Sequence, residues 1–348
     1  NNKLRILGDK MKDYIIAIDA MGGDNAPEEI VKGSIDAIND NKNIKIILVG
    51  KEQEIDSELK KYQYNKEQVQ IQNATEVIQT TESPTAAIRE KKDSSIVVGL
   101  KLLKEGKASA FVSAGSTGAL LTGATVIIKR IKGVERPALA TLIPNANNGY
   151  TFLIDSGANM DCKPSYLPNF AKMGKIYMEN IMKINNPKVA IVNVGSEKEK
   201  GDTFTKEAYE LLEQTKNINF IGNIEGREIP AGDADVVVCD GFVGNVILKL
   251  SEGIVKTFSK VVKNEIKSNF LYSIGGLLSK GAFSNVKKKF DYAEVGGAPF
   301  LGLKSLVVKA HGSSNAKAIK SAINQCYKFI DTDIATKIEN AILEDNNL

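Results

Sequence analysis

The stretch Ala110-Phe-Val-Ser-Ala-Gly-Ser-Thr-Gly-Ala119 decides the fold. Its apolar beginning, Ala110 to Ser113, predicts a buried strand, and a helix is expected over Ala119 to Lys129 after a turn of small residues. Free backbone N–H groups at such a helix start favour an anion, so the turn predicts a phosphate-type ligand. It matches neither a Walker A loop nor a dinucleotide fingerprint, so nucleotide binding is not specifically indicated. The alternative is a helix start whose small residues serve packing alone.

The same alternation of predicted strands and helices continues on both sides of this stretch. Short apolar runs alternate with amphipathic helical patterns, which predicts a mostly parallel three-layer α/β fold with helices on both faces of the sheet. The other expected strands are Tyr14 to Asp19, Ile44 to Val49, Val69 to Gln72, Lys188 to Asn193 and Val236 to Asp240. Helices are expected after Pro27, with Asn25 as a cap, and from Gly244 to Lys267.

One segment departs from the parallel rhythm. Ala138 to Pro144 and Tyr150 to Asp155 flank a turn-forming run of Asn and Gly, which predicts an antiparallel hairpin. No linker-like tract divides the chain, so we expect one catalytic α/β domain over residues 14–345, with two lobes left open as an alternative. Residues 1–13 are treated as an N-terminal extension.

Composition limits the function classes. The 348 residues carry 46 Lys and Arg against 42 Asp and Glu, a net charge of +4 that does not argue for nucleic acid. Three separated cysteines and one histidine predict neither a disulfide framework nor a metal centre, and no cofactor is expected. Without a long apolar run or a signal-like beginning, the sequence predicts a cytoplasmic protein that does not span a bilayer.

Four further strand ends resemble the turn after Ser113 in their chemistry: Asp19 to Asp24, Asp155 to Asn159, Asp240 to Asn245 and Lys309 to Asn315. Because ligands of open α/β sheets gather at the carboxyl ends of strands, we expect these loops to form one shared cradle for an oxyanion. The residues expected to bind phosphate or substrate are Asp19, Gly22, Gly23, Asp24, Ser113, Gly115, Ser116, Thr117, Gly118, Ser156, Gly157, Asp240, Asn245, Ser313 and Arg89. The competing interpretation is that the aspartates cap helices and that the basic side chains are solvated.

Four residues are candidates for catalysis: Lys309, His311, Asp155 and Asn159. Lys309 or His311 could stabilise charge or protonate a departing thiolate, and the N–H groups of Ser116 to Gly118 and Ser156 to Asn159 could hold phosphate and an oxyanion. A lone histidine is often structural, and both readings of His311 stay open. Cys162 would need a base to act as a nucleophile, so inert packing is favoured for it.

The segment from Phe270 to Phe290 is apolar, interrupted by glycines, and followed by lysines. It is too short and broken to span a membrane but could lie on one, or be buried in a dimer interface. We expect a projecting helical segment over residues 265–292. Its candidate membrane contacts are Phe270, Leu271, Ile274, Leu277, Leu278, Phe283, Lys287 and Lys288.

Several ordered motifs together resemble the bacterial acyl carrier protein:phosphate acyltransferase family of phospholipid synthesis. These motifs are AIDAMGGD (Ala17 to Asp24), SAGSTGA (Ser113 to Ala119), DSGAN (Asp155 to Asn159), DGFVGN (Asp240 to Asn245) and GGAPFLG (Gly296 to Gly302). The resemblance runs from about Tyr14 to Ile330 in the family's order.

The resemblance implies a fold like the isocitrate/isopropylmalate dehydrogenase and phosphotransacetylase group. It implies a homodimer attached peripherally to the inner face of the cell membrane, and transfer of an acyl group from acyl carrier protein to inorganic phosphate. A contact with the downstream glycerol-phosphate acyltransferase is left open. The rivals are a decarboxylating dehydrogenase, an acetyl-CoA:phosphate acyltransferase of the same fold group and a non-catalytic membrane scaffold.

Overall fold

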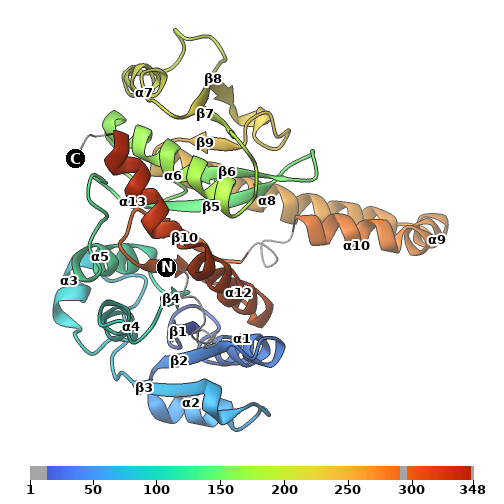
Figure 1. The fold of residues 1–348 in the computed structure, drawn as a ribbon. Coiled ribbons are helices and arrows are strands. Elements are labelled where there is room, and N and C mark those ends of the chain that lie inside the picture. The colour runs from blue at the N-terminus through green and yellow to red at the C-terminus, as the bar shows by residue number, and fades with distance from the viewer. Residues whose placement is uncertain (1–13, 291–295, 346–348) are drawn as a thin grey trace, which may run out of the picture. The chain divides into compact units, whose positions relative to one another are not determined.

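The computed structural model describes residues 14–290 and 296–345 (Figure 1). The chain divides into two compact units: unit 1 comprises Asn1–Ile128 and Ser305–Asp331, and unit 2 comprises Lys129–Lys304 and Thr332–Leu348. The N-terminal extension predicted for residues 1–13 lies outside the described residues. So do residues 291–292, the end of the predicted projecting segment.

Unit 1 contains a parallel sheet in the order β3-β2-β1-β4-β11. Its strands are β1 (Tyr14–Asp19), β2 (Ile44–Gly50), β3 (Val69–Asn73), β4 (Ala110–Ser113) and β11 (Leu306–Lys309). Val112 pairs with both Ile18 and Val308. The residues that follow these three, Asp19, Ser113 and Lys309, therefore form one row at the carboxyl edge of the sheet.

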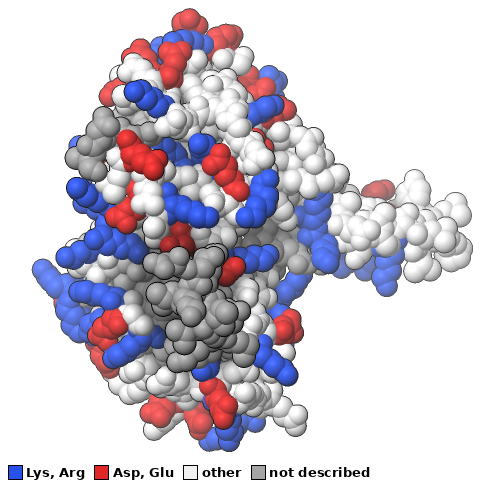
Figure 2. All heavy atoms as spheres, viewed as in Figure 1, with Lys and Arg blue, Asp and Glu red and all other residues white. Residues whose placement is uncertain are grey.

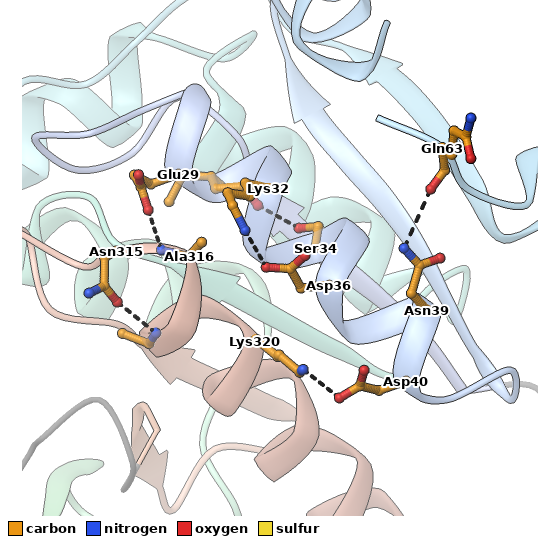
Figure 3. A network of polar contacts seen from close by, with 12 residues as sticks. Glu29, Lys32, Ser34, Asp36, Asn39, Asp40, Gln63, Asn315, Ala316 and Lys320 are labelled. Atoms are coloured by element: carbon orange, nitrogen blue, oxygen red, sulfur yellow. Dashed lines mark hydrogen bonds and ion pairs between the residues drawn. The ribbon is translucent and has the colours of Figure 1, made fainter. Parts of the chain in front are cut away.

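Helices cover both faces of this sheet (Figure 1). They are α1 (Glu28–Asp40), α2 (Glu52–Leu59), α3 (Pro84–Glu90), α4 (Ser95–Lys104), α5 (Thr117–Ile127) and α12 (Ala316–Thr332). Helix α1 packs closely on α12. A Cβ atom at Gly33 would lie 2.5 Å from the Ala316 carbonyl oxygen, so only glycine allows this approach. Polar contacts reinforce this packing in Figure 3, where Glu29 accepts from the Ala316 amide and Lys320 pairs with Asp40.

Unit 2 contains a mixed sheet in the order β10-β5-β6-β9-β7-β8. Its strands are β5 (Ala138–Pro144), β6 (Tyr150–Ile154), β7 (Lys188–Asn193), β8 (Asn219–Glu225), β9 (Val236–Val238) and β10 (Ala298–Leu301). Strand β5 is antiparallel to both β10 and β6, whereas β6, β9, β7 and β8 run parallel. The predicted antiparallel hairpin is thus confirmed.

The helices of unit 2 are α6 (Leu167–Asn180), α7 (Thr203–Glu213), α8 (Gly241–Ile266), α9 (Phe270–Leu278), α10 (Lys280–Lys289) and α13 (Ile334–Asp345). Strand alternation divides the core between the two faces of the sheet. Phe152 faces α6, where its ring stacks on Tyr177 with centroids 4.3 Å apart. The next residue, Leu153, faces a second cluster against which Val243 and Ile247 of α8 pack.

Helices α8, α9 and α10 form an arm that projects from the sheet of unit 2 (Figure 1). Beyond its first turns α8 is largely exposed, and so are the apolar side chains of α9, such as Leu278 at 83%. Lys289, near the end of α10, donates to the Asn148 side chain at 2.8 Å. Among the described residues, no helix is long and apolar enough to cross a membrane.

The predicted fold class is confirmed. Helices α5 and α8 begin at Thr117 and Gly241, before the predicted Ala119 and Gly244, and a helix cap and a strand end also need correction. Asn25 was expected to cap α1, but its side chain donates instead to the carbonyls of Ser313 and Ser314, and α1 begins after Pro27. The strand expected to reach Asp240 ends at Val238, because the Asp240 carboxylate caps α8.

A substitution at Gly99 tests the packing of α4 on β4. A Cβ atom at Gly99 would lie 2.1 Å from the ring of Phe111, which is fully buried and cannot move away. We expect Gly99→Ala to lower the free energy of unfolding by about 1–3 kcal/mol in urea denaturation. The control is Gly253→Ala, at a helical glycine with no neighbour within 4 Å, which should be neutral or stabilising by up to about 1 kcal/mol. Equal stability of the two variants would contradict this account.

Candidate active site

A buried carboxylate organises the carboxyl edge of the sheet in unit 1. Asp19 is 1% exposed, and its Oδ2 accepts from Ser113 Oγ at 2.6 Å. Ser113 Oγ in turn accepts from the Gly115 amide at 3.0 Å. Burial raises the pKa of Asp19, while hydrogen bonds from Ser113 and Ser95 and the charge of Lys309 act in the opposite direction. The row thus fixes the start of the turn between β4 and α5.

Two glycines bring the turn after β1 against its neighbours. A Cβ atom at Gly22 would lie 2.4 Å from Asp19 Oδ2 and 2.7 Å from the Gly115 nitrogen, so only glycine allows this approach. Gly23 has a φ of +97°, and a Cβ atom there would lie 2.9 Å both from Ala114 Cβ and from the Gly312 carbonyl oxygen. The Asp24 amide donates to that carbonyl at 2.8 Å, which ties this turn to the one after β11.

The turn after β11 orients the single histidine. The amide of Ser313 donates to His311 Nδ1 at 3.2 Å, and Ser313 Oγ lies 2.9 Å from the same nitrogen. An Nδ1 atom that accepts cannot carry the ring proton, so this geometry places the proton of the neutral imidazole on Nε2. His311 is thereby fixed in one tautomer.

Lys309 is a buried cation in the row. It is 9% exposed, and its Nζ donates to the carbonyl of Ala114 at 3.1 Å and to that of Ala310. The ammonium therefore supports the backbone of the turn after β4 and adds positive charge beside it.

Helix α5 begins at this turn. Ser116 caps it, with its Oγ accepting from the Ala119 amide at 3.4 Å. In residues 14–290 and 296–345, the amides of Thr117 and Gly118 have no protein acceptor. These two donors and the positive end of the helix dipole can hold an anion.

Unit 2 has its own buried carboxylate, at the end of β6. Asp155 accepts five hydrogen bonds: from the amides of Leu139, Gly157, Ala158 and Asn159, and from Asn159 Nδ2. Burial raises its pKa, and these hydrogen bonds oppose the shift. The amide of Ser156 donates to the Leu139 carbonyl. The expectation that amides 156–159 hold an oxyanion is therefore wrong for this structure, because each already has an internal acceptor.

The turn after β9 interlocks with this loop. The Gly241 amide donates to the Asn159 carbonyl at 2.9 Å. A Cβ atom at Gly244 would lie 1.8 Å from the backbone carbonyl oxygen of Asp155. Asn245 lies against Gly157, whose φ is +138°. Asp240 accepts from the amides of Phe242 and Val243, so it caps α8, as the competing interpretation held.

Beside this loop lies a hollow of about 440 Å³ in unit 2. It is lined by Met160, Asp161, Cys162, Lys163, Asp202, Phe204 and Asp240. Burial, together with the charges of Asp155 and Asp240, raises the pKa of the Cys162 thiol to about 12, with Arg136 acting against the shift. Burial also raises the pKa of Cys239 and Cys326. A thiol held protonated is a poor nucleophile, which agrees with inert packing for Cys162.

The structure thus brings three of the five predicted turns together within unit 1 and the other two within unit 2. Arg89 does not join them among the described residues: its side chain is 78% exposed and lies 3.5 Å from Glu90. Sequence reasoning missed three supporting residues. Ser95 contacts Asp19 from the start of α4, Thr141 Oγ1 lies 2.9 Å from Ser156 Oγ, and Glu29 accepts from Ala316. Only Ser95, at the start of an apolar helical pattern, carried a recognisable signal.

Comparison with known proteins identifies the family. Residues 14–337 match the family described as fatty acid synthesis protein. The chain belongs to this family. It is 52% identical over 327 residues to a phosphate acyltransferase of Clostridium perfringens, covering 94% of this chain and 96% of the relative. It is 50% identical to a phosphate acyltransferase of Clostridium acetobutylicum, covering 95% and 100%.

A solved phosphotransacetylase from Streptococcus pyogenes has a similar fold. The two structures superpose with a TM-score of 0.60 at 19% identity, covering 92% of this chain and 94% of the other. At this identity the likeness concerns the fold alone, and it confirms the predicted fold group.

The five hydrogen bonds of Asp155 give a test of the loop in unit 2. In Asp155→Asn one acceptor oxygen becomes an NH₂ group, so at least two buried donors lose their acceptor. We expect the free energy of unfolding to fall by about 1–3 kcal/mol for each donor left unpaired, measured by urea denaturation. Asp161→Asn, the same change at an exposed position of the same loop, serves as the control and should have little effect. Retained stability in the first variant would show that Asp155 does not organise the loop.

Proposed function

We propose that this chain is a phosphate acyltransferase that moves a fatty acyl group from the thioester of an acyl carrier protein to inorganic phosphate. The observation that carries the proposal is the row Asp19, Ser113 and Lys309, which holds the start of α5 beside a buried cation. Membership in the family and the names of its members support the same activity.

Phosphate is placed at the start of α5 in this proposal. The amides of Thr117 and Gly118 would donate to its oxygens, and the Lys309 ammonium would offset part of its charge. Gly22 and Gly23 keep side chains away from this turn, so a ligand can approach the backbone. Asp19 does not contact phosphate in this arrangement; it positions the turn through Ser113.

The reaction needs no covalent intermediate on the protein. An oxygen of HPO₄²⁻ attacks the thioester carbonyl carbon, the C–O bond forms and the C–S bond breaks. The proton of the phosphate leaves with the thiol, so the products are the acyl phosphate dianion and free carrier thiol. Holding the two reactants in attack geometry therefore supplies much of the rate.

His311 serves as a hydrogen-bond donor in this proposal. Because its Nδ1 accepts from Ser313, its Nε2–H can donate to an oxygen or sulfur that gains negative charge. Proton transfer from a neutral imidazole would leave a costly anion, so we favour a donor role over the general-acid role considered from the sequence.

The rival activities differ in what they require. A decarboxylating dehydrogenase would need a carboxylate cluster for its metal, and within the described ranges no group of three His, Cys, Asp or Glu residues is placed to hold one. An acetyl-CoA-dependent enzyme would differ in its acyl donor. A scaffold without catalysis would leave the interlocked turns of unit 1 without a role.

The arm of unit 2 has two exposed apolar surfaces. Val246, Leu250, Ile254, Phe258 and Val261 lie on one face of α8 at helical spacing, which is typical of a helix that meets another helix. The second surface is α9, with Phe270, Leu271, Leu277 and Leu278 between 72% and 83% exposed.

We propose that the α8 face pairs with a second copy of the chain and that α9 enters the cytoplasmic surface of the membrane. Figure 2 supports the second part, since the end of the arm is largely uncharged and Lys or Arg side chains lie along its side. Of the other predicted membrane contacts, Ile274 is 42% and Phe283 44% exposed, and Lys288 is exposed, whereas the Lys287 side chain lies outside the described residues. A contact with a glycerol-phosphate acyltransferase stays a prediction.

The activity is tested by incubating the purified chain with an acyl carrier protein thioester, with and without phosphate. We expect equal amounts of acyl phosphate and free thiol, and only with phosphate. His311→Asn keeps an acceptor for Ser313 but loses the Nε2 donor, so kcat should fall by about 100- to 1000-fold. His311→Gln restores an N–H near that position and should retain more activity. Release of thiol without phosphate would overturn the proposal.

Reciprocal variants separate the two surfaces of the arm. Leu277→Asp with Leu278→Asp should reduce co-sedimentation with anionic vesicles while the mass in solution stays dimeric, because these side chains would leave the lipid interface. Ile254→Asp with Phe258→Asp should give monomers in analytical ultracentrifugation, because charge is buried where the helices meet. Dimers that persist in the second pair would rule out the α8 face as the interface.

A further inference from the structure

A group of cations lies on unit 2 outside the two clusters of turns. Lys129, Arg130, Lys132, Arg136 and Lys304 are all exposed and are called the basic strip here. The eight residues from 129 to 136 contain four of these cations and one carboxylate, that of Glu135. This is a dense local charge for a chain whose net charge is only +4.

Two separate segments build the basic strip. The Lys304 amide donates to the Lys129 carbonyl at 3.1 Å, and the Ile131 amide donates to the Gly302 carbonyl at 3.0 Å. The backbone pairing holds Lys304 beside Lys129 and Arg130, and Gly302 lies against Val134 and Pro137, so the two segments form one surface.

The cations of the strip are not neutralised by ion pairs. In the described part of the chain, none of the five lies within 4.0 Å of a carboxylate oxygen, and Arg130 donates to the backbone carbonyl of Glu135. Elsewhere in unit 2 exposed lysines do pair, as Lys198 does with Glu213 at 2.6 Å. The strip therefore presents an uncompensated positive field to solvent, which attracts an acidic partner.

The strip continues into the loop of unit 2. Pro137 follows Arg136 directly, and its carbonyl accepts from Asn159 Nδ2 at 2.9 Å. Arg136 is also close enough for its charge to act on Cys162, which lines the hollow of about 440 Å³. A partner seated on the strip would thus have the hollow beside it.

The strip lacks apolar side chains that could enter a bilayer. The two large aliphatic residues between its cations in segment 129–136, Ile131 and Val134, are 3% and 5% exposed and belong to the core. This contrasts with α9, where the apolar side chains are turned to solvent. The chemistry of the strip therefore favours an acidic protein surface over a lipid surface.

We propose that the basic strip docks the acidic carrier protein that delivers the acyl thioester, with the carrier seated beside the hollow that Cys162 lines. This inference rests on the proposed function for the identity of the partner. The docking surface is new, and the chemistry of transfer stays as proposed above.

A matched pair of double variants tests the docking surface. Lys132→Glu with Lys304→Glu reverses two charges of the strip. Lys188→Glu with Lys216→Glu makes the same change in net charge on exposed lysines at the amino ends of β7 and β8, the sheet edge opposite the loop. The Kd for fluorescently labelled acyl carrier protein is measured by anisotropy at low and high salt. Transfer is measured with the carrier thioester and with acyl-pantetheine, which lacks the protein.

We expect the strip variant to raise the Kd and the KM for carrier thioester on the order of tenfold, less at high salt, and the control variant to leave both near wild type. KM for phosphate and turnover of acyl-pantetheine should not change. Equal effects of the two double variants would overturn the inference, as would lost binding to anionic vesicles with an unchanged carrier Kd. Because the Kd needs no turnover, strip-dependent carrier binding by a wild-type protein without activity would refute the proposed function while upholding the docking surface.

Discussion

A carboxylate removed from water must be surrounded by hydrogen-bond donors, and this requirement shapes both clusters of turns. Asp155 gathers four backbone amides and one side-chain amide around it, and so closes the loop that follows β6. Asp19 acts through Ser113, whose hydroxyl donates to the Asp19 carboxylate and accepts from the Gly115 amide. The two clusters differ in one respect: the amides of the unit 2 loop all donate within the protein, whereas among the described residues the first amides of α5 in unit 1 have no protein acceptor.

Strands with strong apolar patterns could be predicted from the sequence because their burial is intrinsic to the pattern. Tyr14–Asp19, Ala110–Ser113 and Lys188–Asn193 were placed with their observed bounds. Strand β8, Asn219–Glu225, was missed, because it lies at the edge of its sheet and carries polar residues with little apolar alternation. Strand β10 was missed for another reason: it contains a proline and pairs with residues far away in sequence.

The positions of site residues at strand ends could be predicted from the sequence, but their hydrogen-bond partners could not. Parallel strands bring Asp19, Ser113 and Lys309 to one edge by topology, so their proximity could be expected from strand order alone. The direction of a hydrogen bond cannot be inferred in this way. Whether amides 156–159 face a ligand or a neighbouring carboxylate depends on the path of the loop, and so does the choice of Asp240 between ligand and cap.

The state of the cysteines has a chemical consequence for the proposed reaction with an acyl thioester. Any thiolate near such a substrate can capture the acyl group by thioester exchange and become a dead-end adduct. Burial and the charges of Asp155 and Asp240 raise the pKa of the Cys162 thiol beside the hollow, so this thiol stays protonated at neutral pH. Cys239 and Cys326 are buried. In the proposed reaction the fold would thereby keep the protein from acylating itself, although sulfur lies close to the loop of unit 2.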